Sequence, residues 1–372
     1  MAGVKVPYLN FPEEYRRYQK QMLGAVTRIL ERGDFIMGND VATFESEFAK
    51  LSGTRHAIGV ANGTDALVLA LKVLGIGPGD EVLTAANSFL ATAAAIALVG
   101  AKPVFADVED DQGISPKAIE KAIGPKTKAL LPVHLTGRCC DLTPILKIAT
   151  KHHLHVIEDA AQSVGASVDG IKAGGGGILG CFSLHPLKNL NACGDAGIIT
   201  TNDDGLANRL RLLRNHGLKN RDEVDFWGVN SRLDSLQAAI LLTRLPVLAS
   251  TIEKRRALAK RYTDALSKFV RCPSDSANRP HTYHVYVIQT QHRDELKDFL
   301  AARGIDTKIH YPIPIHLQKA AAYLEYHPGS LPNTERQAKQ ILSLPINQYL
   351  SEEQLDWVIE SVRAFFSKLS SI

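Results

Sequence analysis

The chain has 372 residues, of which 45% are hydrophobic and 22% are charged, which is the composition of an ordinary soluble globular protein. This length is too great for one small core, so we expect two domains. The formal net charge is only +4, and lysine and arginine form no dense run. The charge therefore argues against binding to nucleic acid or to a membrane surface.

Cysteine usage and the N-terminal segment indicate the compartment. The five cysteines stand at positions 139, 140, 181, 193 and 272, without a CxxC pair. An odd number of scattered cysteines favours a reducing compartment, so we expect a cytoplasmic protein. The first 18 residues lack the apolar core of a signal peptide. No HExxH or Cys/His ligand spacing is present, and we expect no metal site.

Short apolar strands alternate with helices from about residue 65 to residue 201. We expect helices at 64–74, 88–98 and 142–152, a helix that starts at Ser115-Pro116, and strands at 81–84, 103–106, 129–133 and 155–158. This alternation predicts an α/β fold with a mostly parallel sheet and right-handed crossovers. Ligands in such folds bind at the carboxyl ends of the strands. Asp159 and the turns at Gly63 and Asn87 lie at such ends.

The pattern becomes helical after residue 206 and mixed in the last third. We expect helices at 232–245, 252–269, 294–302 and 352–366, and strands at 284–289 and 307–310. The chain therefore divides into a large domain at 14–248 and a smaller C-terminal α+β domain at 249–372. We expect residues 1–13 to pack on the smaller domain or on a partner subunit.

One lysine and one aspartate carry the strongest chemical signal. Lys188 lies in a bend between two apolar runs, ahead of the glycines of Gly194-Asp195-Ala196-Gly197, and Asp159 ends the strand that begins at residue 155. A partly desolvated lysine can carry pyridoxal phosphate (PLP) as a Schiff base. A strand-end carboxylate can hold the pyridine nitrogen of PLP in its protonated form. Taken alone, a solvated loop lysine and a surface carboxylate are the commoner cases.

Four further positions suit the same cofactor. Gly63 and Thr64 open a helix directly after a strand, and free N–H groups at a helix N-terminus suit a phosphate. Ser183 would add a hydroxyl to that phosphate, and Phe89 would stack on a flat ring. The ordinary alternatives are a helix cap, a satisfied strand hydroxyl and a core aromatic. No GxxxxGK[ST] or GxGxxG motif is present, so a nucleotide-binding loop is not favoured.

Together these motifs resemble the DegT/DnrJ/EryC1/StrS family of PLP-dependent sugar aminotransferases. The resemblance runs nearly from end to end, through GNDVATFE at 38–45, NGTDAL at 62–67, GDEV at 79–82, SFLAT at 88–92, EDAAQ at 158–162, the segment 182–197, NSRL with LQAA at 230–239, and HYPIP at 310–314. It implies the aspartate aminotransferase fold (PLP fold type I), with a large domain and a smaller C-terminal α+β domain.

The resemblance also implies a role for each matching residue. It implies that Lys188 forms the Schiff base, Asp159 holds the ring nitrogen, Gln162 contacts the ring, Phe89 stacks on it, and Gly63, Thr64 and Ser183 hold the phosphate. The position of Asn230 in the family reaches the phosphate of the neighbouring subunit, which implies a homodimer with shared active sites. His185, His310 and Tyr311 fall where such enzymes contact the sugar.

Two departures affect the substrate more than the chemistry. Ser231 and Thr136 stand where tyrosine is common in the family, near where a sugar would bind. Family members that dehydrate sugars carry histidine at the position of Lys188, so the lysine favours transamination. A PLP-dependent sugar dehydratase and a catalytically silent, PLP-bound regulatory protein are the alternatives.

The resemblance implies transfer of an amino group, from L-glutamate, to a keto or aldehyde carbon of a sugar. Such enzymes serve cell-surface polysaccharide (lipopolysaccharide) or secondary-metabolite biosynthesis. The HPLKNLN segment at 185–191, together with RNHGL at 214–218 and NRDE at 220–223, is similar to a branch that makes 8-amino-3,8-dideoxy-octulosonate from its 8-oxo precursor. A nucleotide-linked 3-keto or 4-keto hexose is an equally open alternative.

Overall fold

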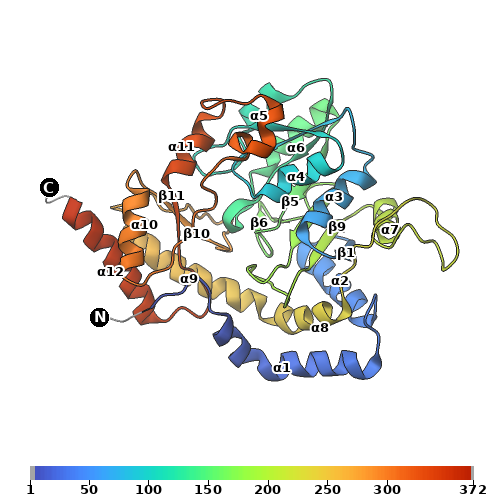
Figure 1. Cartoon of the computed structure of the whole chain (residues 1–372), viewed down its shortest axis with the longest axis horizontal. Helices are drawn as coiled ribbons and strands as arrows, with labels where there is room; N and C mark the ends of the chain where they lie inside the picture. The colour runs from blue at the N-terminus through green and yellow to red at the C-terminus, as the bar shows by residue number, and fades with distance from the viewer. Residues whose placement is uncertain (1–4, 370–372) are drawn as a thin grey trace.

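The computed structural model describes residues 5–369, so residues 1–4 of the expected N-terminal segment lie outside it. A seven-stranded sheet forms its centre, in the order β1-β9-β8-β5-β4-β2-β3 (Figure 1). The strands are β1 (His56–Val60), β2 (Glu81–Ala85), β3 (Lys102–Ala106), β4 (Thr127–Leu131), β5 (His155–Asp159), β8 (Leu179–Ser183) and β9 (Gly197–Thr201). Only β9 runs antiparallel to its neighbours β1 and β8. The expected α/β fold with a mostly parallel sheet is confirmed.

Helices cover the sheet, as the continuous burial of its apolar strands requires. They are α1 (Phe11–Arg32), α2 (Asn39–Ser52), α3 (Gly63–Val73), α4 (Leu90–Leu98), α5 (Pro116–Ala122), α6 (Leu142–His152), α7 (Asp204–Leu213) and α8 (Ser235–Arg244). The expected start at Ser115-Pro116 is confirmed, because the Ser115 side chain accepts the N–H of Ala118 and Pro116 occupies the first helical position. Short 3-10 turns lie at Leu135–Gly137 and Leu245–Val247, and a small hairpin pairs β6 (Ser167–Val168) with β7 (Ile171–Lys172).

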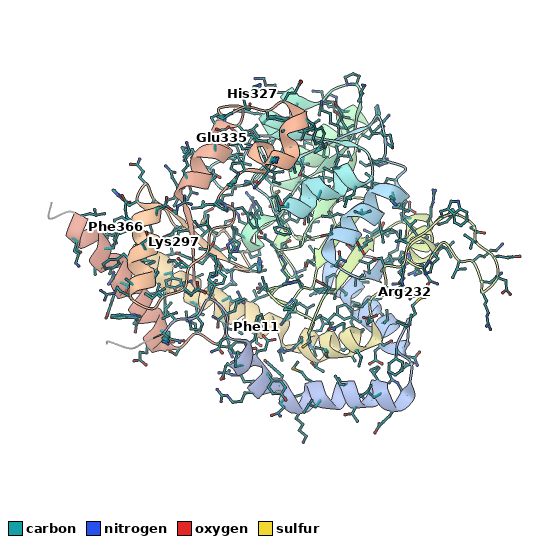
Figure 2. All side chains as sticks on the ribbon, viewed as in Figure 1. Phe11, Arg232, Lys297, His327, Glu335 and Phe366 are labelled. Atoms are coloured by element: carbon teal, nitrogen blue, oxygen red, sulfur yellow. The ribbon has the colours of Figure 1, made fainter. Side chains whose placement is uncertain are left out.

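The C-terminal part builds a second core around two paired strands. It contains α9 (Leu248–Leu266), β10 (Tyr286–Gln289), α10 (Arg293–Ala302), β11 (Ile341–Leu344) and α12 (Glu352–Leu369). Tyr262 and Tyr286 are fully buried in this core. Lys297 on α10 and Phe366 on α12 mark the end of the molecule farthest from Arg232 (Figure 2). Val6 pairs with Ile305 here, so the start of the described chain joins this part.

One C-terminal segment returns to the large sheet. Two 3-10 turns (Ile315–Leu317 and Lys319–Leu324) and α11 (Pro332–Gln340) lie beside α4 and α5 at the top of Figure 1, and His327 and Glu335 mark them in Figure 2. Leu324 and Leu331 pack with Phe105 of β3. The segment continues the chain from His310 and Tyr311 along the edge of the sheet at which the parallel strands end.

Two expected boundaries and one expected strand differ from the structure for local reasons. The strand expected at 129–133 ends at Leu131, because Pro132 has no N–H to donate to a sheet. The helix expected from residue 88 begins at Leu90, because Phe89 is extended. The strand expected at 307–310 was wrong: Lys308 exchanges two backbone hydrogen bonds with Ser343 of β11, but the segment meets β11 at this single residue and forms no ladder.

The helix pair α8–α9 is apolar enough to cross a membrane by length and composition alone. Ala238, Ala239 and Leu241 are buried, however, and α8 packs against α1 and α2. This apolar stretch therefore belongs to the core of the fold.

Candidate active site

The carboxyl ends of three parallel strands meet at one edge of the sheet. β5 ends on Asp159, its parallel neighbour β8 ends on Ser183, and β2 is followed by the turn that leads to Phe89. Because parallel strands all end at the same edge, these side chains are brought together as predicted. The bend that contains Lys188 leaves this edge directly after β8.

Lys188 is held in a tight turn and shielded from water. Its N–H donates to the carbonyl of His185 at 2.8 Å. Burial lowers the pKa of its amine to about 8, and the carboxylate of Asp159 opposes that shift. A lowered pKa makes a larger share of the amine neutral near pH 7, which is the form that acts as nucleophile and base.

The buried amine predicts a pH-dependent stability of the cofactor-free protein. The folded protein releases this proton near pH 8 and the unfolded chain near pH 10.5, so stability rises with pH across that interval. At pH 7 the free energy of unfolding of Lys188→Met should therefore exceed that of wild type by about 3 kcal/mol. Most of this gain should vanish by pH 10, and denaturant titrations at the two pH values measure it. Lys172→Met, at an exposed position, is the control. An equal gain at both pH values would contradict the prediction.

Asp159 is buried and accepts two hydrogen bonds. Thr92 Oγ1 donates to its Oδ2 at 2.7 Å, and the N–H of Ala161 donates to Oδ1 at 3.2 Å. Burial raises the pKa of this carboxyl, while the two donors and the charge of Lys188 lower it. Thr92 in turn pairs with Ser88 Oγ at 2.7 Å. The buried hydroxyls of Thr92 on α4 and of Ser88 just before it thus position the carboxylate that faces the site.

Sequence reasoning missed the role of Thr92. The residue was visible only as the end of the SFLAT segment, and the contact of its hydroxyl with Ser88, which precedes α4, appears only in the structure. We expect Thr92→Val to lower kcat about tenfold, because the carboxylate of Asp159 loses one of its two donors. Steady-state kinetics checks this, with Thr43→Val as the control, since Thr43 is exposed and its hydroxyl donates to the Asn39 carbonyl within α2. Equal kinetics in the two variants would argue against the role.

The HYP segment joins the site from the C-terminal part of the chain. The Gln162 side chain donates from Nε2 to the hydroxyl of Tyr311 at 3.3 Å, and its Oε1 accepts the N–H of Thr136 at 2.9 Å. The rings of Phe89 and Tyr311 lie 5.6 Å apart. His310 Nδ1 contacts Ser343 Oγ at 2.8 Å. Burial, with the charges of Lys188 and Lys308, lowers the pKa of His310 to about 4, so this imidazole is neutral at pH 7.

The start of α3 forms a cradle beside Ser183. A Cβ placed on Gly63 would lie 2.7 Å from Cβ of Ser183, so only glycine allows this approach. Asn62 caps the helix by accepting the N–H of Asp65. The N–H groups of Gly63 and Thr64 belong to the first turn and have no helical acceptor. The cradle therefore offers two backbone donors and a hydroxyl to an anion.

Two further predicted residues, His185 and Asn230, contact the backbone of neighbouring segments. The His185 ring accepts the N–H of Leu187 and so braces the bend. Asn230 is exposed and bridges to Asn215, on the segment between α7 and α8 that projects from the body in Figure 1. Its role needs a second subunit. The functions of both residues stay predictions.

The side chains at the two positions that depart from the family pattern form hydrogen bonds within the protein. Ser231 is buried, and its hydroxyl donates to Asp65 Oδ2 at 2.6 Å beneath the cradle. Thr136 Oγ1 donates to the Leu135 carbonyl at 2.7 Å and lies 3.2 Å from His281 Nε2. Both positions support the walls of the site.

Comparison with known proteins places this site in a family. Residues 16–363 match the DegT/DnrJ/EryC1/StrS aminotransferase family. The chain belongs to that family. A "pleiotropic regulatory protein" of Geobacillus stearothermophilus is 43% identical over 98% of this chain and 99% of its own. A dTDP-3-amino-3,4,6-trideoxy-alpha-D-glucose transaminase of Streptomyces venezuelae is 42% identical over 98% of this chain and 97% of its own.

A solved structure agrees with these relatives. Streptomyces venezuelae DesV, in complex with a ketimine intermediate, matches with a TM-score of 0.95 and 42% identity, over 97% of this chain and 98% of that one. In transamination, a ketimine is the Schiff base that the aminated form of PLP makes with a keto compound. This member of the family is thus a PLP-dependent sugar aminotransferase with the expected aspartate aminotransferase fold.

Proposed function

We propose that this enzyme transfers an amino group from L-glutamate to the keto carbon of a nucleotide-linked hexose. The observation that carries the proposal is that Lys188 lies near the hydrogen-bonded carboxylate of Asp159. Burial lowers the pKa of the Lys188 amine. The names of relatives support the sugar class, since one is a dTDP-sugar transaminase and another a UDP-N-acetyl-3-dehydro-alpha-D-glucosamine aminotransferase.

The residues present fit PLP. The Gly63–Ser183 cradle offers donors for its phosphate, Asp159 a carboxylate for its ring nitrogen, and Phe89 a half-exposed ring for its face. When bound, PLP supplies an electron sink for the negative charge that develops on the substrate carbon. Lys188, once its amine is free, would move a proton between a carbon of the substrate and a carbon of the cofactor. Gln162 and Tyr311, joined by a hydrogen bond, limit where the substrate can lie.

We also propose a homodimer with shared active sites. Phe35, Ile36 and Met37 expose apolar side chains in one continuous stretch, and Leu187 exposes another directly beside Lys188. A second copy of the chain would cover such a surface. The projecting segment that carries Asn230 would then reach the phosphate cradle of the other subunit. We propose as well that the large domain ends at residue 248 and that the enzyme acts in the cytoplasm.

For the pathway and for the acceptor sugar, we propose the chemical class. The enzyme would serve cell-surface polysaccharide or secondary-metabolite biosynthesis. The 8-oxo-3,8-dideoxy-octulosonate remains the second acceptor to test, because the HPLKNLN segment at 185–191 favours it.

A glutamate-dependent assay over nucleotide-linked 3-keto and 4-keto hexoses and free acidic keto sugars tests this proposal. We expect a product that has gained one amino nitrogen, which mass spectrometry detects. Loss of oxygen without gain of nitrogen would show a dehydratase instead. Conversion of bound PLP by glutamate with no acceptor in the whole panel would favour a regulatory protein, the function named for the Geobacillus stearothermophilus relative.

A further inference from the structure

The loop that follows Lys188 is anchored at every second residue by a different part of the chain. Asn189 Nδ2 donates to the Thr282 carbonyl (3.0 Å), Asn191 Nδ2 donates to Glu14 Oε1 (2.8 Å), and the backbone of Cys193 exchanges two hydrogen bonds with the Gln237 side chain (2.9 and 3.2 Å). The first anchor precedes β10 and the third is on α8. The middle anchor lies on α1, far away in the sequence.

The middle anchor is a buried carboxylate with three donors. Glu14, in the first turn of α1, is 8% exposed. Besides Asn191, it accepts from Arg244 Nη2 at 2.7 Å and from the hydroxyl of Tyr349 at 3.4 Å. The donors therefore come from the Lys188 loop, the end of α8 and the C-terminal part. Figure 1 shows α1 running along α8, and Phe11 marks its first residue in Figure 2.

Charge fixes Glu14 in this place. Arg244 is 5% exposed, and its guanidinium lies over the ring of Tyr18 at 4.5 Å. A buried guanidinium needs a counter-charge, and Glu14 is the carboxylate that pairs with it. Because this ion pair holds Glu14 still, the same carboxylate can hold the Asn191 amide in one orientation.

We propose that Glu14 is a positioning residue for Lys188. By fixing Asn191 it holds the bend that keeps Lys188 at the strand ends and away from water, and through Tyr349 it ties that bend to the C-terminal part. This inference rests on the proposed function of Lys188 as the lysine that carries the cofactor. Glu14 touches neither cofactor nor substrate in this account.

Glu14→Gln in the full-length protein tests the proposal, with Glu13→Gln as the matched control. Glu13 lies in the same helical turn but pairs with Arg16 and Arg17 at the surface. The first readout is acylation of Lys188 by acetic anhydride at a series of pH values in cofactor-free protein, followed by peptide mass analysis. We expect the apparent pKa of Lys188 to rise by about one unit in Glu14→Gln, because a looser bend admits water. Glu13→Gln should match wild type.

The second readout is turnover of the PLP-loaded protein. We expect kcat to fall about tenfold in Glu14→Gln with KM for glutamate nearly unchanged, since a displaced lysine slows proton transfer without removing a substrate contact. Asn191→Ala should give the same shift and loss while it leaves the Glu14–Arg244 pair intact, so it decides the question if Glu14→Gln fails to fold.

The outcomes separate this proposal from the proposed function. Wild-type labelling profiles and kcat values in both variants, with PLP attached to Lys188 in wild type, would overturn the positioning role alone. Absence of PLP from Lys188 in wild type would overturn the function on which it rests.

Discussion

Replacing Lys188 by alanine should reduce transamination about 10⁴-fold, to the limit of detection. The reason is that the variant loses the Lys188 amine, which is placed at the strand ends to move the proton between carbons, and general base catalysis of this kind contributes up to about 10⁴-fold. A single-turnover reaction of the PLP-loaded protein with glutamate measures this step directly. The variant should still bind PLP, because the cradle at Gly63 and Ser183 is unchanged.

Lys172→Ala controls for the loss of a lysine as such, since that side chain is exposed on β7. Added small primary amines should restore part of the lost rate in Lys188→Ala, because they can enter the space that the side chain leaves. Substantial glutamate turnover in Lys188→Ala without added amine would mean that another group carries the proton.

Replacing Asp159 by asparagine should lower kcat about 10³-fold, or about 4 kcal/mol in the barrier. Asparagine keeps the shape of the side chain: its oxygen can accept from the N–H of Ala161, and its NH₂ can donate to Thr92 Oγ1, whose hydroxyl turns to Ser88, so the fold should change little. What the variant loses is the negative charge that holds the ring nitrogen protonated, and with it the electron sink. Steady-state kinetics with saturating glutamate gives the loss.

Asp141→Asn is the matched control, because Asp141 is an exposed residue before α6 whose side chain makes no capping hydrogen bond. We expect wild-type kinetics from it. A decrease of less than tenfold in Asp159→Asn would remove Asp159 from the chemistry and leave it a buried structural carboxylate.

The alternation of strands and helices from residue 65 to 201 was enough to predict the parallel part of the sheet. The signal was strong because each strand is buried on both faces and so reads as a short apolar run. The same reasoning placed Asp159 at a strand end, whereas the position of Ser183 at the end of β8 is a finding of the structure. The bend at Lys188 followed from the glycines after it and from the family motif.

The remaining features depend on contacts between distant parts of the chain. Nothing near Glu14 indicates that it meets Asn191 and Arg244, because α1 is a mostly polar helix and the partners lie on other elements. The hydrogen bond from Thr92 to Asp159 likewise needs the sheet to bring α4 beside β5. The wrong strand at 307–310 has a similar cause, since alternation cannot show that the segment meets β11 only at Lys308.

The most direct test of the account is to find which lysine binds PLP. The PLP-loaded protein is reduced with borohydride, digested, and its peptides are weighed. We expect a single pyridoxyl modification, on Lys188, that disappears in Lys188→Ala while Lys172→Ala retains it. A modification on a different lysine, or no modification in wild type, would contradict the central claim.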